Sequence, residues 1–154
     1  MMNVREQEHI TRDAWEAFMQ LIQVHGFCMQ HTLKKYGLYE GQPAFLFQIR
    51  DMGAPSQNEL AKALGVSKSS AGVTLRRLEK SGFVKREQDR LDSRCNRVAL
   101  TKKGQEIARW CEMDVDMVAN NMLEEFSADE RETALKVIKR MYKGLDAMRT
   151  RIKA

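Results

Sequence analysis

The sequence predicts a mainly α (α+β) fold in which a helix-turn-helix and a β-hairpin lie between long helices at the two ends of the chain. Three observations carry this prediction. Residues 56–82 contain two short amphipathic segments, each preceded by a capping serine and followed by a glycine. Residues 83–100 contain two short strand-like runs around a polar segment. Residues 11–35 and 101–152 carry apolar side chains at three- and four-residue steps, the period of an amphipathic helix.

The two short helices are bounded by recognisable caps. Ser56 and Glu59 fit a capping box, and Gly65 supplies the left-handed residue that ends the first helix. Ser67 can cap the second helix, which we expect to run to about residue 80 and to close at Gly82. Two short helices joined by a glycine-containing turn form a helix-turn-helix, whose second helix enters the major groove of DNA.

The second short helix has two chemically different faces. At 100° per residue, Ala71, Thr74, Leu75 and Leu78 share one face and can pack on the first helix. The opposite face is small, hydroxylated or basic, and side chains of these kinds bind base edges and phosphates. The residues of this helix and its cap that we expect to meet DNA are Ser67, Lys68, Ser69, Ser70, Gly72, Val73, Arg76, Arg77 and Lys80.

An arginine-rich hairpin follows the second helix. Residues 83–86 and 97–100 are predicted strands around a polar tip at 87–96. Arginines at such a tip suit the minor groove, where narrow A·T-rich stretches concentrate negative potential. Asp92 is near enough to Arg94 to hold its guanidinium by a charge-assisted hydrogen bond. The hairpin residues that we assign to the DNA-binding surface are Arg90, Asp92, Arg94 and Arg97.

Several short runs between residues 38 and 104 form a combined pattern. They are Asn58-Glu59-Leu60-Ala61, Val66-Ser67-Lys68-Ser69-Ser70, Leu78-Glu79-Lys80-Ser81-Gly82-Phe83-Val84, Asp92-Ser93-Arg94 and Val98-Ala99-Leu100-Thr101-Lys102-Lys103-Gly104. In combination they resemble the MarR family of winged helix-turn-helix transcriptional regulators. The resemblance implies a dimeric DNA-binding regulator, with Arg94 in the minor groove. At Val73 the chain departs from the family, whose members often carry a long polar or basic side chain there.

The charge distribution favours a polyanionic partner. The net charge is +5, yet residues 67–103 alone hold eleven Lys and Arg against four Asp and Glu, a net of +7. Such a concentrated excess is the electrostatic footprint of nucleic-acid binding. RNA is disfavoured, because Phe83 is the only aromatic residue between Phe47 and Trp110 and therefore no stacking platform accompanies the charge.

Composition places the chain among cytoplasmic globular proteins. The 154 residues are 43% apolar and 31% charged, which suits a single chain with one sizeable core. No run of 18 apolar residues indicates a membrane span, and the charged N-terminus is unlike a signal peptide. The cysteines Cys28, Cys95 and Cys111 are odd in number and far apart, which favours a reducing compartment over a disulfide framework.

The long helices at the two ends of the chain are predicted to form the interface of a homodimer. A helix at 11–35 is followed by a shorter one at about 40–51, and Thr101 and Ser127 are predicted caps of two more. The apolar stripes of the long helices exceed what one small winged domain can cover. A two-fold dimer would present two reading helices to the half-sites of a pseudo-palindromic operator. We therefore assign residues 38–104 to a DNA-binding lobe, and residues 1–37 and 105–154 to a dimerisation region in which, by the resemblance, the first, fifth and sixth helices interlock.

The resemblance also bears on regulation. The resemblance implies a repressor released by a small aromatic or anionic effector, held between the dimer helices and the winged lobe. Side chains that could line such a crevice are Trp15, Phe18, Ile22, His25, Phe45 and Trp110. A redox- or metal-responsive regulator of the same fold is the alternative. Its candidates are Cys95, beside a basic neighbour, and the cluster His25, Cys28 and His31. Because residues 25 and 31 are about 120° apart around a helix, we expect no metal site and no resident cofactor.

Two other functional classes are disfavoured. The chain has no Gly-x-Ser-x-Gly, no phosphate-binding glycine loop and no His-Glu-x-x-His, and its three histidines all precede residue 32. We therefore expect no enzymatic activity. A winged-helix module that binds only protein remains a third class, but it would not need the concentrated positive charge.

Overall fold

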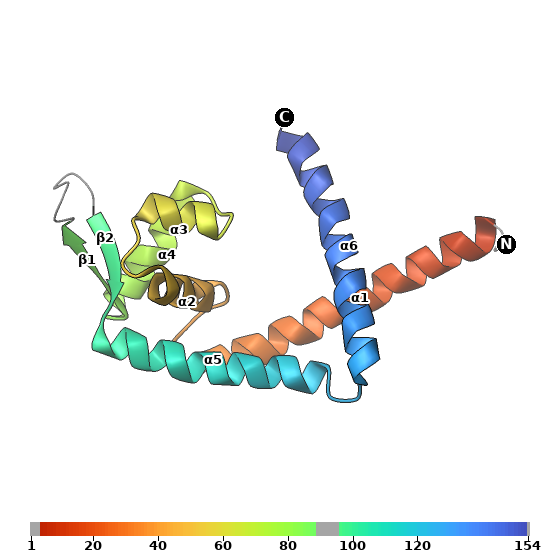
Figure 1. Ribbon diagram of the computed structural model, residues 1–154, viewed down its shortest axis with the longest axis horizontal. Helices are drawn as coiled ribbons and strands as arrows, with labels where there is room; N and C mark the ends of the chain where they lie inside the picture. The colour runs from red at the N-terminus through yellow and green to blue at the C-terminus, as the bar shows by residue number, and fades with distance from the viewer. Residues whose placement is uncertain (1–3, 89–95, 154) are drawn as a thin grey trace. The chain divides into compact units, whose positions relative to one another are not determined.

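The computed structural model describes residues 4–88 and 96–153, so Arg90, Asp92, Arg94 and Cys95 lie outside the described residues. Six helices and one hairpin form the described chain (Figure 1). Their order is α1 (Val4–Lys34), α2 (Gln42–Met52), α3 (Gln57–Ala63), α4 (Lys68–Lys80), β1 (Val84–Gln88), β2 (Asn96–Leu100), α5 (Lys102–Met122) and α6 (Ala128–Lys153). The predicted mainly helical fold with one β-hairpin is confirmed.

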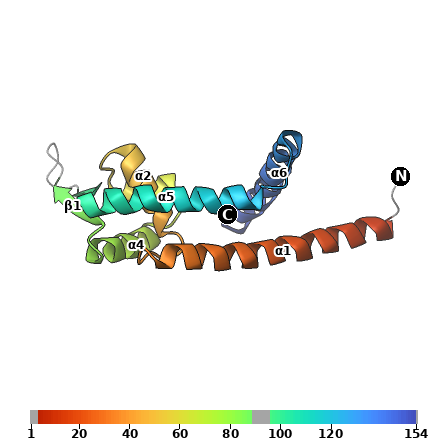
Figure 2. The ribbon, with the colours of Figure 1, turned by 90° about the horizontal axis from the view of Figure 1, so that it is seen from below.

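The chain forms two compact units, Met1–Val118 and Ala119–Ala154. In the first unit, α2, α3 and α4 lie beside the hairpin, and α5 begins directly after β2 (Figures 1 and 2). The core of this unit draws side chains from every one of its helices and from both strands. Its fully buried large side chains are Leu33, Leu46, Ile49, Leu60, Leu75, Leu78, Val98 and Cys111. Burial of a large aliphatic side chain contributes about 1.5–3 kcal/mol, so this cluster holds the helix-turn-helix and the hairpin together.

The helix-turn-helix has the predicted caps. The Ser56 hydroxyl accepts a hydrogen bond from the Glu59 N–H at 3.3 Å, and the Ser56 N–H donates to Glu59 Oε2 at 2.7 Å, which completes the capping box. The Ser67 hydroxyl accepts from the Ser70 N–H at 3.0 Å and opens α4. Gly65 has a φ of +65°, the left-handed conformation that the turn between the helices requires.

The hairpin is attached to the residues that precede α3. Its two antiparallel strands pair Val84 with Leu100 and Gln88 with Asn96, so both strands extend further toward the tip than predicted. The Val98 N–H donates to the Pro55 carbonyl at 2.8 Å, and Ser56 forms an isolated antiparallel bridge with Arg97. Strand β2 therefore has backbone partners on both sides.

The junction between the hairpin and α5 explains the Thr-Lys-Lys-Gly run. The Thr101 hydroxyl donates to the Gly82 carbonyl at 2.6 Å and accepts from the Gly104 N–H at 3.0 Å, so Thr101 caps α5 as predicted. A Cβ atom on Gly104 would lie 1.9 Å from the carbonyl oxygen of Phe83. The glycine is therefore needed for α5 to approach the backbone of the preceding turn.

The long helices carry many exposed apolar side chains. Helix α1 begins at Val4 and not near residue 11, because residues 4–10 contain no helix-breaking residue. In the second unit, the predicted capping box at Ser127 is present: the Ser127 N–H donates to Glu130 Oε2 at 2.8 Å. Within the described ranges, no helix combines the length and the apolar character that crossing a membrane requires.

Candidate DNA interface

Helix α4 separates its apolar and polar side chains as predicted. Ala71, Leu75 and Leu78 are buried, and Thr74 is half-buried. Lys68, Ser69, Ser70, Val73, Arg76, Arg77 and Lys80 are exposed, and Val73 is 38% exposed. The outer face of α4 therefore offers hydroxyl groups, positive charges and one small apolar side chain to a neighbouring surface.

Gly72 differs from the expectation, which placed it on the exposed face. The structure buries it, and a Cβ atom there would lie 3.1 Å from Gln57 Nε2. Gln57 begins α3 and donates from Nε2 to the Lys68 carbonyl at 3.1 Å, so its side chain covers Gly72. The residue permits close packing of α3 on α4 in the free protein, and it is not available for a close approach to DNA until Gln57 moves.

Two serines of the predicted set bond each other. The hydroxyls of Ser67 and Ser70 are 2.8 Å apart, and the Ser67 hydroxyl also caps α4. Both side chains therefore stabilise the first turn of the helix, whereas Ser69 beside them is exposed and has no such helix-capping role.

The arginines of the hairpin strands have acidic partners. Arg97 Nη1 donates to Glu59 Oε2 at 2.9 Å, and Arg86 Nε donates to Glu79 Oε2 at 3.3 Å. Sequence reasoning missed Arg86, whose partner lies on the preceding helix and belongs to no local motif. Of the predicted hairpin residues, Arg97 is thus described in an ion pair, while Arg90, Asp92 and Arg94 lie outside the described residues.

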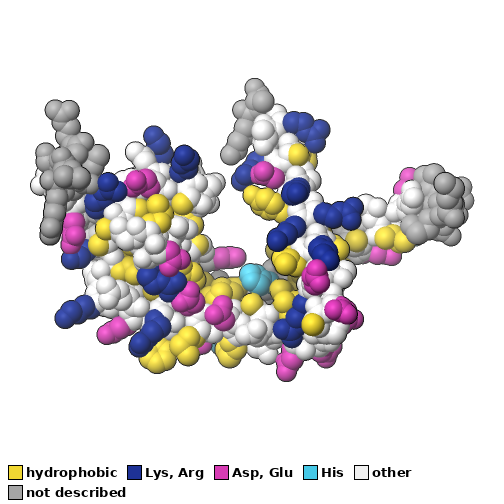
Figure 3. Space-filling view, in the orientation of Figure 1, with side chains coloured by type: hydrophobic (Ala, Val, Ile, Leu, Met, Phe, Trp, Pro, Cys, Tyr) yellow, Lys and Arg dark blue, Asp and Glu magenta, His cyan; other side chains and the backbone are white. Residues whose placement is uncertain are grey.

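The positive charge of α4 is not neutralised in this way. Within residues 4–88 and 96–153, Lys68, Arg76, Arg77 and Lys80 form no ion pair. Figure 3 shows Lys and Arg side chains spread over the part of the first unit that contains α3, α4 and the hairpin. These cations can bind phosphate without first breaking an ion pair, which makes them the best candidates for phosphate contacts.

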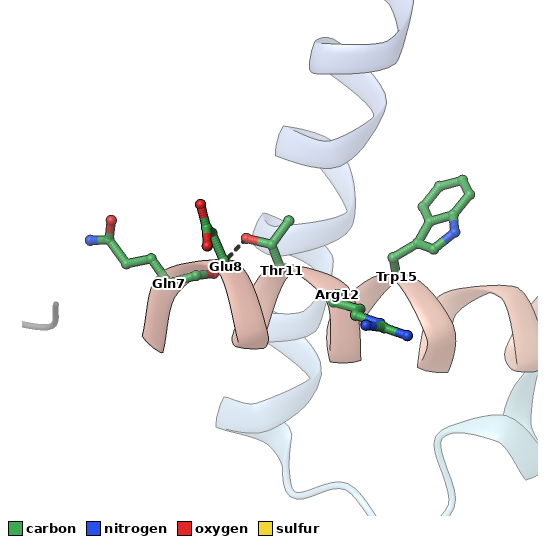
Figure 4. Close-up of a pocket in the computed structure, with 5 residues that line it drawn as sticks. All are labelled: Gln7, Glu8, Thr11, Arg12 and Trp15. Atoms are coloured by element: carbon green, nitrogen blue, oxygen red, sulfur yellow. Dashed lines mark hydrogen bonds between the residues drawn. The ribbon is translucent and has the colours of Figure 1, made fainter. Parts of the chain in front are cut away.

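The residues predicted to line an effector crevice have different environments. Trp15 and Phe18 are neighbours on α1, with ring centroids 6.2 Å apart, whereas Phe45 is buried in the core. Trp15 lines a surface pocket of about 470 Å³ with Gln7, Glu8, Thr11 and Arg12, all on the same helix (Figure 4). Ile22 and Trp110 are about half exposed, and His25 is exposed.

A pocket that the sequence did not predict lies at the base of the hairpin. It has a volume of about 500 Å³ and is lined by Ile49, Arg50, Gly53, Ala54, Ala99, Leu100, Gln105 and Arg109. Ala54 has a φ of +56°, which is uncommon for a residue other than glycine. The residues come from α2, the loop that follows it, β2 and α5, so no local sequence pattern could have identified them.

Two acidic side chains join α5 to the rest of the first unit. Asp114 bonds the Lys35 ammonium and the Tyr36 hydroxyl, and these hydrogen bonds lower its pKa. Glu112 accepts two bonds from the Arg50 guanidinium, at 2.6 and 2.8 Å, which lower the pKa of Glu112. Helix α5 is therefore held to the end of α1 and to α2 by charge-assisted bonds.

The described thiols and histidines give little support to sensing chemistry. Burial raises the pKa of the Cys111 thiol to about 11, and the nearby Asp114 charge raises it further, so the reactive thiolate is disfavoured. In the part of the chain that the structure describes, no group of three or more His, Cys, Asp or Glu side chains could hold a metal ion.

The chain is similar in sequence and in fold to known transcriptional regulators. Residues 38–95 match the model of the MarR family. A crystal structure of MarR is 29% identical, with a TM-score of 0.69 over 87% of this chain and 91% of that chain. The PcaV transcriptional regulator from Streptomyces coelicolor, in complex with its natural ligand, is 19% identical, with a TM-score of 0.69 over 82% and 89% of the two chains. A MarR transcriptional regulator from Methanosarcina mazei Go1 is 22% identical, with a TM-score of 0.72 over 88% and 99%.

Proposed function

Because this chain carries a MarR family domain and the winged-helix fold of MarR regulators, we propose that it is a sequence-specific regulator of transcription that binds double-stranded DNA. MarR family transcriptional regulators are DNA-binding proteins without enzymatic activity. The observation that carries the proposal for this chain is the exposed face of α4, where four cations have no carboxylate partner among the described residues.

Binding to DNA is tested by titrating duplex fragments selected from the host genome. Because several phosphate contacts release counterions, the association constant should fall steeply as salt rises. Binding that does not depend on salt would contradict the proposal, as would equal affinity for every fragment. The genes beside the selected fragments would also indicate which process is regulated.

We further propose that the functional form is a homodimer bound to a pseudo-palindromic operator. Residues 38–104 would form the DNA-binding lobe, and residues 1–37 and 105–154 the dimerisation region. The support is that α1 exposes large apolar side chains along its length, and that α6 does so too. Examples are Trp15 at 58%, Ile138 at 55% and Leu145 at 57%. Exposed apolar stripes of this extent mark interaction surfaces. A sedimentation experiment that finds a monomer at working concentration would contradict this proposal.

The regulatory proposal is a cytoplasmic repressor that leaves its operator when a small aromatic or anionic effector binds. The similar PcaV structure contains a natural ligand, which supports a search for one here. The candidate effector-binding residues are Trp15, Phe18, Ile22, His25, Phe45 and Trp110. Release of bound operator by one compound class, and its loss in a Trp15→Ala variant, would support the proposal. Release by peroxide that requires Cys95, or by zinc, would favour the redox or metal alternative.

A further inference from the structure

The first turn of α3 contacts both strands of the hairpin. On one side, Glu59 binds Arg97 of β2 at 2.9 Å. On the other side, Gln57 Oε1 accepts a bond from Arg86 of β1 at 3.5 Å. Gln57 also donates to the Lys68 carbonyl in the first turn of α4. One helical turn of α3 therefore connects the hairpin to the helix that we propose reads DNA.

The Glu59 carboxylate has two roles at once. Its Oε2 atom accepts from the Ser56 N–H at 2.7 Å, which closes the capping box, and from Arg97 Nη1 at 2.9 Å. The backbone on either side is also paired, since Val98 donates to Pro55 and Ser56 bridges to Arg97. The same carboxylate oxygen thus binds both the N-terminus of α3 and a side chain of β2.

We infer that Arg97 is a positioning residue, which holds the hairpin at a fixed place relative to α4 through Glu59, and that it is not a phosphate contact. This inference rests on the proposed function. Arg97 differs from the cations of α4 because its guanidinium already has a carboxylate partner in the free protein. A phosphate would have to compete with that carboxylate, whereas Arg76 and Lys68 have no such competitor among the described residues.

The Arg97–Glu59 ion pair affects the placement of the hairpin more than the free energy of unfolding. The Arg97 side chain is 38% exposed and that of Glu59 is 51% exposed, and pairs exposed to this degree contribute little to the free energy of unfolding. Loss of the pair leaves the backbone bond from Val98 to Pro55 and the Arg86–Glu79 pair in place, and it removes a side-chain restraint from the tip end of β2. The outer part of the hairpin can then adopt orientations that do not fit DNA together with α4. The DNA affinity should then fall by about three- to tenfold, while the thermal midpoint changes little.

The test uses the intact protein and one operator fragment over a range of salt concentrations. The variants are Arg97→Ala, Glu59→Gln, the double variant, and Lys102→Ala as a control for a lost phosphate contact. Lys102 is exposed at the start of α5 and belongs to the basic segment 67–103, so we expect it to contact phosphate and no base. Glutamine can replace glutamate in a capping box, so Glu59→Gln keeps the bond to the Ser56 N–H and removes the charge that holds Arg97. Each lost phosphate contact makes the negative slope of log K against log salt shallower by about 0.9.

We expect both single variants to bind DNA more weakly than the wild type, and the double variant to bind no more weakly than Arg97→Ala. The salt slope should stay at the wild-type value in all three variants. Glu59→Gln gives the sharpest result. Removing a negative charge should strengthen DNA binding on Coulomb grounds alone, whereas loss of positioning weakens it. Non-additivity would show that the two residues act as one unit.

Three results would overturn the inference. Arg97→Ala could lower the salt slope as Lys102→Ala does, Glu59→Gln could tighten binding, or Arg97→Ala could leave the affinity unchanged. If Arg97→Ala lowers the thermal midpoint strongly, its effect on DNA binding no longer separates positioning from folding. The DNA affinity and salt slope of Glu59→Gln, and of a further variant Arg97→Lys, are then compared with those of the wild type in the same way. Failure of the proposed function is a separate result, since the wild-type protein would then show no salt-dependent binding to DNA.

Discussion

The carbonyl oxygen of Phe83 occupies the space that a side chain on Gly104 would need, at 1.9 Å from an ideal Cβ. The obstructing atom belongs to the backbone, so no rotamer change could relieve the overlap. It lies where α5 leaves the hairpin, beside the Thr101 hydroxyl that caps the helix. The orientation of α5 against the winged part of the first unit therefore depends on a residue without a side chain.

The first prediction is that Gly104→Ala lowers the free energy of unfolding by about 1–3 kcal/mol, because the added methyl group forces α5 away from Phe83. Denaturant titration at fixed protein concentration measures this change. Gly144→Ala in α6 is the matched control, since nothing lies within 4 Å of its ideal Cβ. That variant should be neutral or more stable by up to about 1 kcal/mol, as alanine has the higher helix propensity. Equal effects of the two substitutions would show that the Phe83 contact relaxes at no cost.

The second prediction concerns pH. Hydrogen bonds from Lys35 and Tyr36 lower the pKa of Asp114. A carboxylate with a lowered folded-state pKa contributes stability that is present above its unfolded pKa and is lost as the pH falls through the folded pKa. Asp114→Asn should therefore be destabilised by about 1–2 kcal/mol near neutral pH. The difference from wild type should shrink below about pH 4, the ordinary range of an aspartate pKa.

Unfolding titrations at several pH values test this expectation. The control is Asp116→Asn on the same helix, since Asp116 is exposed. It should change stability little at any pH. A difference between Asp114→Asn and wild type that stays constant from neutral to acidic pH would mean that the Asp114 charge contributes nothing to the joint between α1 and α5.

A third prediction separates sequence reading from anchoring on DNA. Ser69→Ala or Arg76→Ala should change the preference among operator variants, by about 1–3 kcal/mol for each lost base contact. Lys102→Ala should weaken binding to all sequences alike and lower the salt slope. Competition titrations with a small set of operator variants distinguish the two patterns. An Arg76→Ala variant that is neutral on every site would show that a different part of α4 faces the bases.

Local sequence predicted the elements and their caps well, and the reason is the short range of the contacts involved. The capping boxes at Ser56 and Ser127 and the cap at Ser67 are each satisfied by a residue three positions along the chain. Likewise, the apolar face of α4 follows from helical periodicity, which needs no knowledge of the partner helix.

The features of the candidate site that the sequence did not predict depend on residues far apart in the chain. Gly72 is buried because Gln57 of the neighbouring helix covers it. Arg97 and Glu59 are 38 positions apart, and Arg50 and Glu112 are 62 apart. A charged side chain in a sequence gives no sign of whether a carboxylate will reach it, so the net charge of residues 67–103 overstates the number of cations that are free to bind phosphate.

The last prediction concerns Arg90, Asp92 and Arg94 at the hairpin tip, which lie outside the described part of the structure. Arg94→Ala should cost more DNA affinity than Arg90→Ala, because Arg94 belongs to the Asp92-Ser93-Arg94 motif that the MarR resemblance places in the minor groove. An arginine that Asp92 holds in place loses less rotamer freedom on binding, so less of its attraction to DNA is offset by ordering. Asp92→Ala should then weaken binding, although removal of a negative charge would strengthen it on Coulomb grounds alone. Titration of wild type, the two single variants and the double variant against one operator at fixed salt decides the matter. Weaker, non-additive binding would show that Asp92 and Arg94 act together, whereas tighter binding by Asp92→Ala would mean that the aspartate merely repels phosphate.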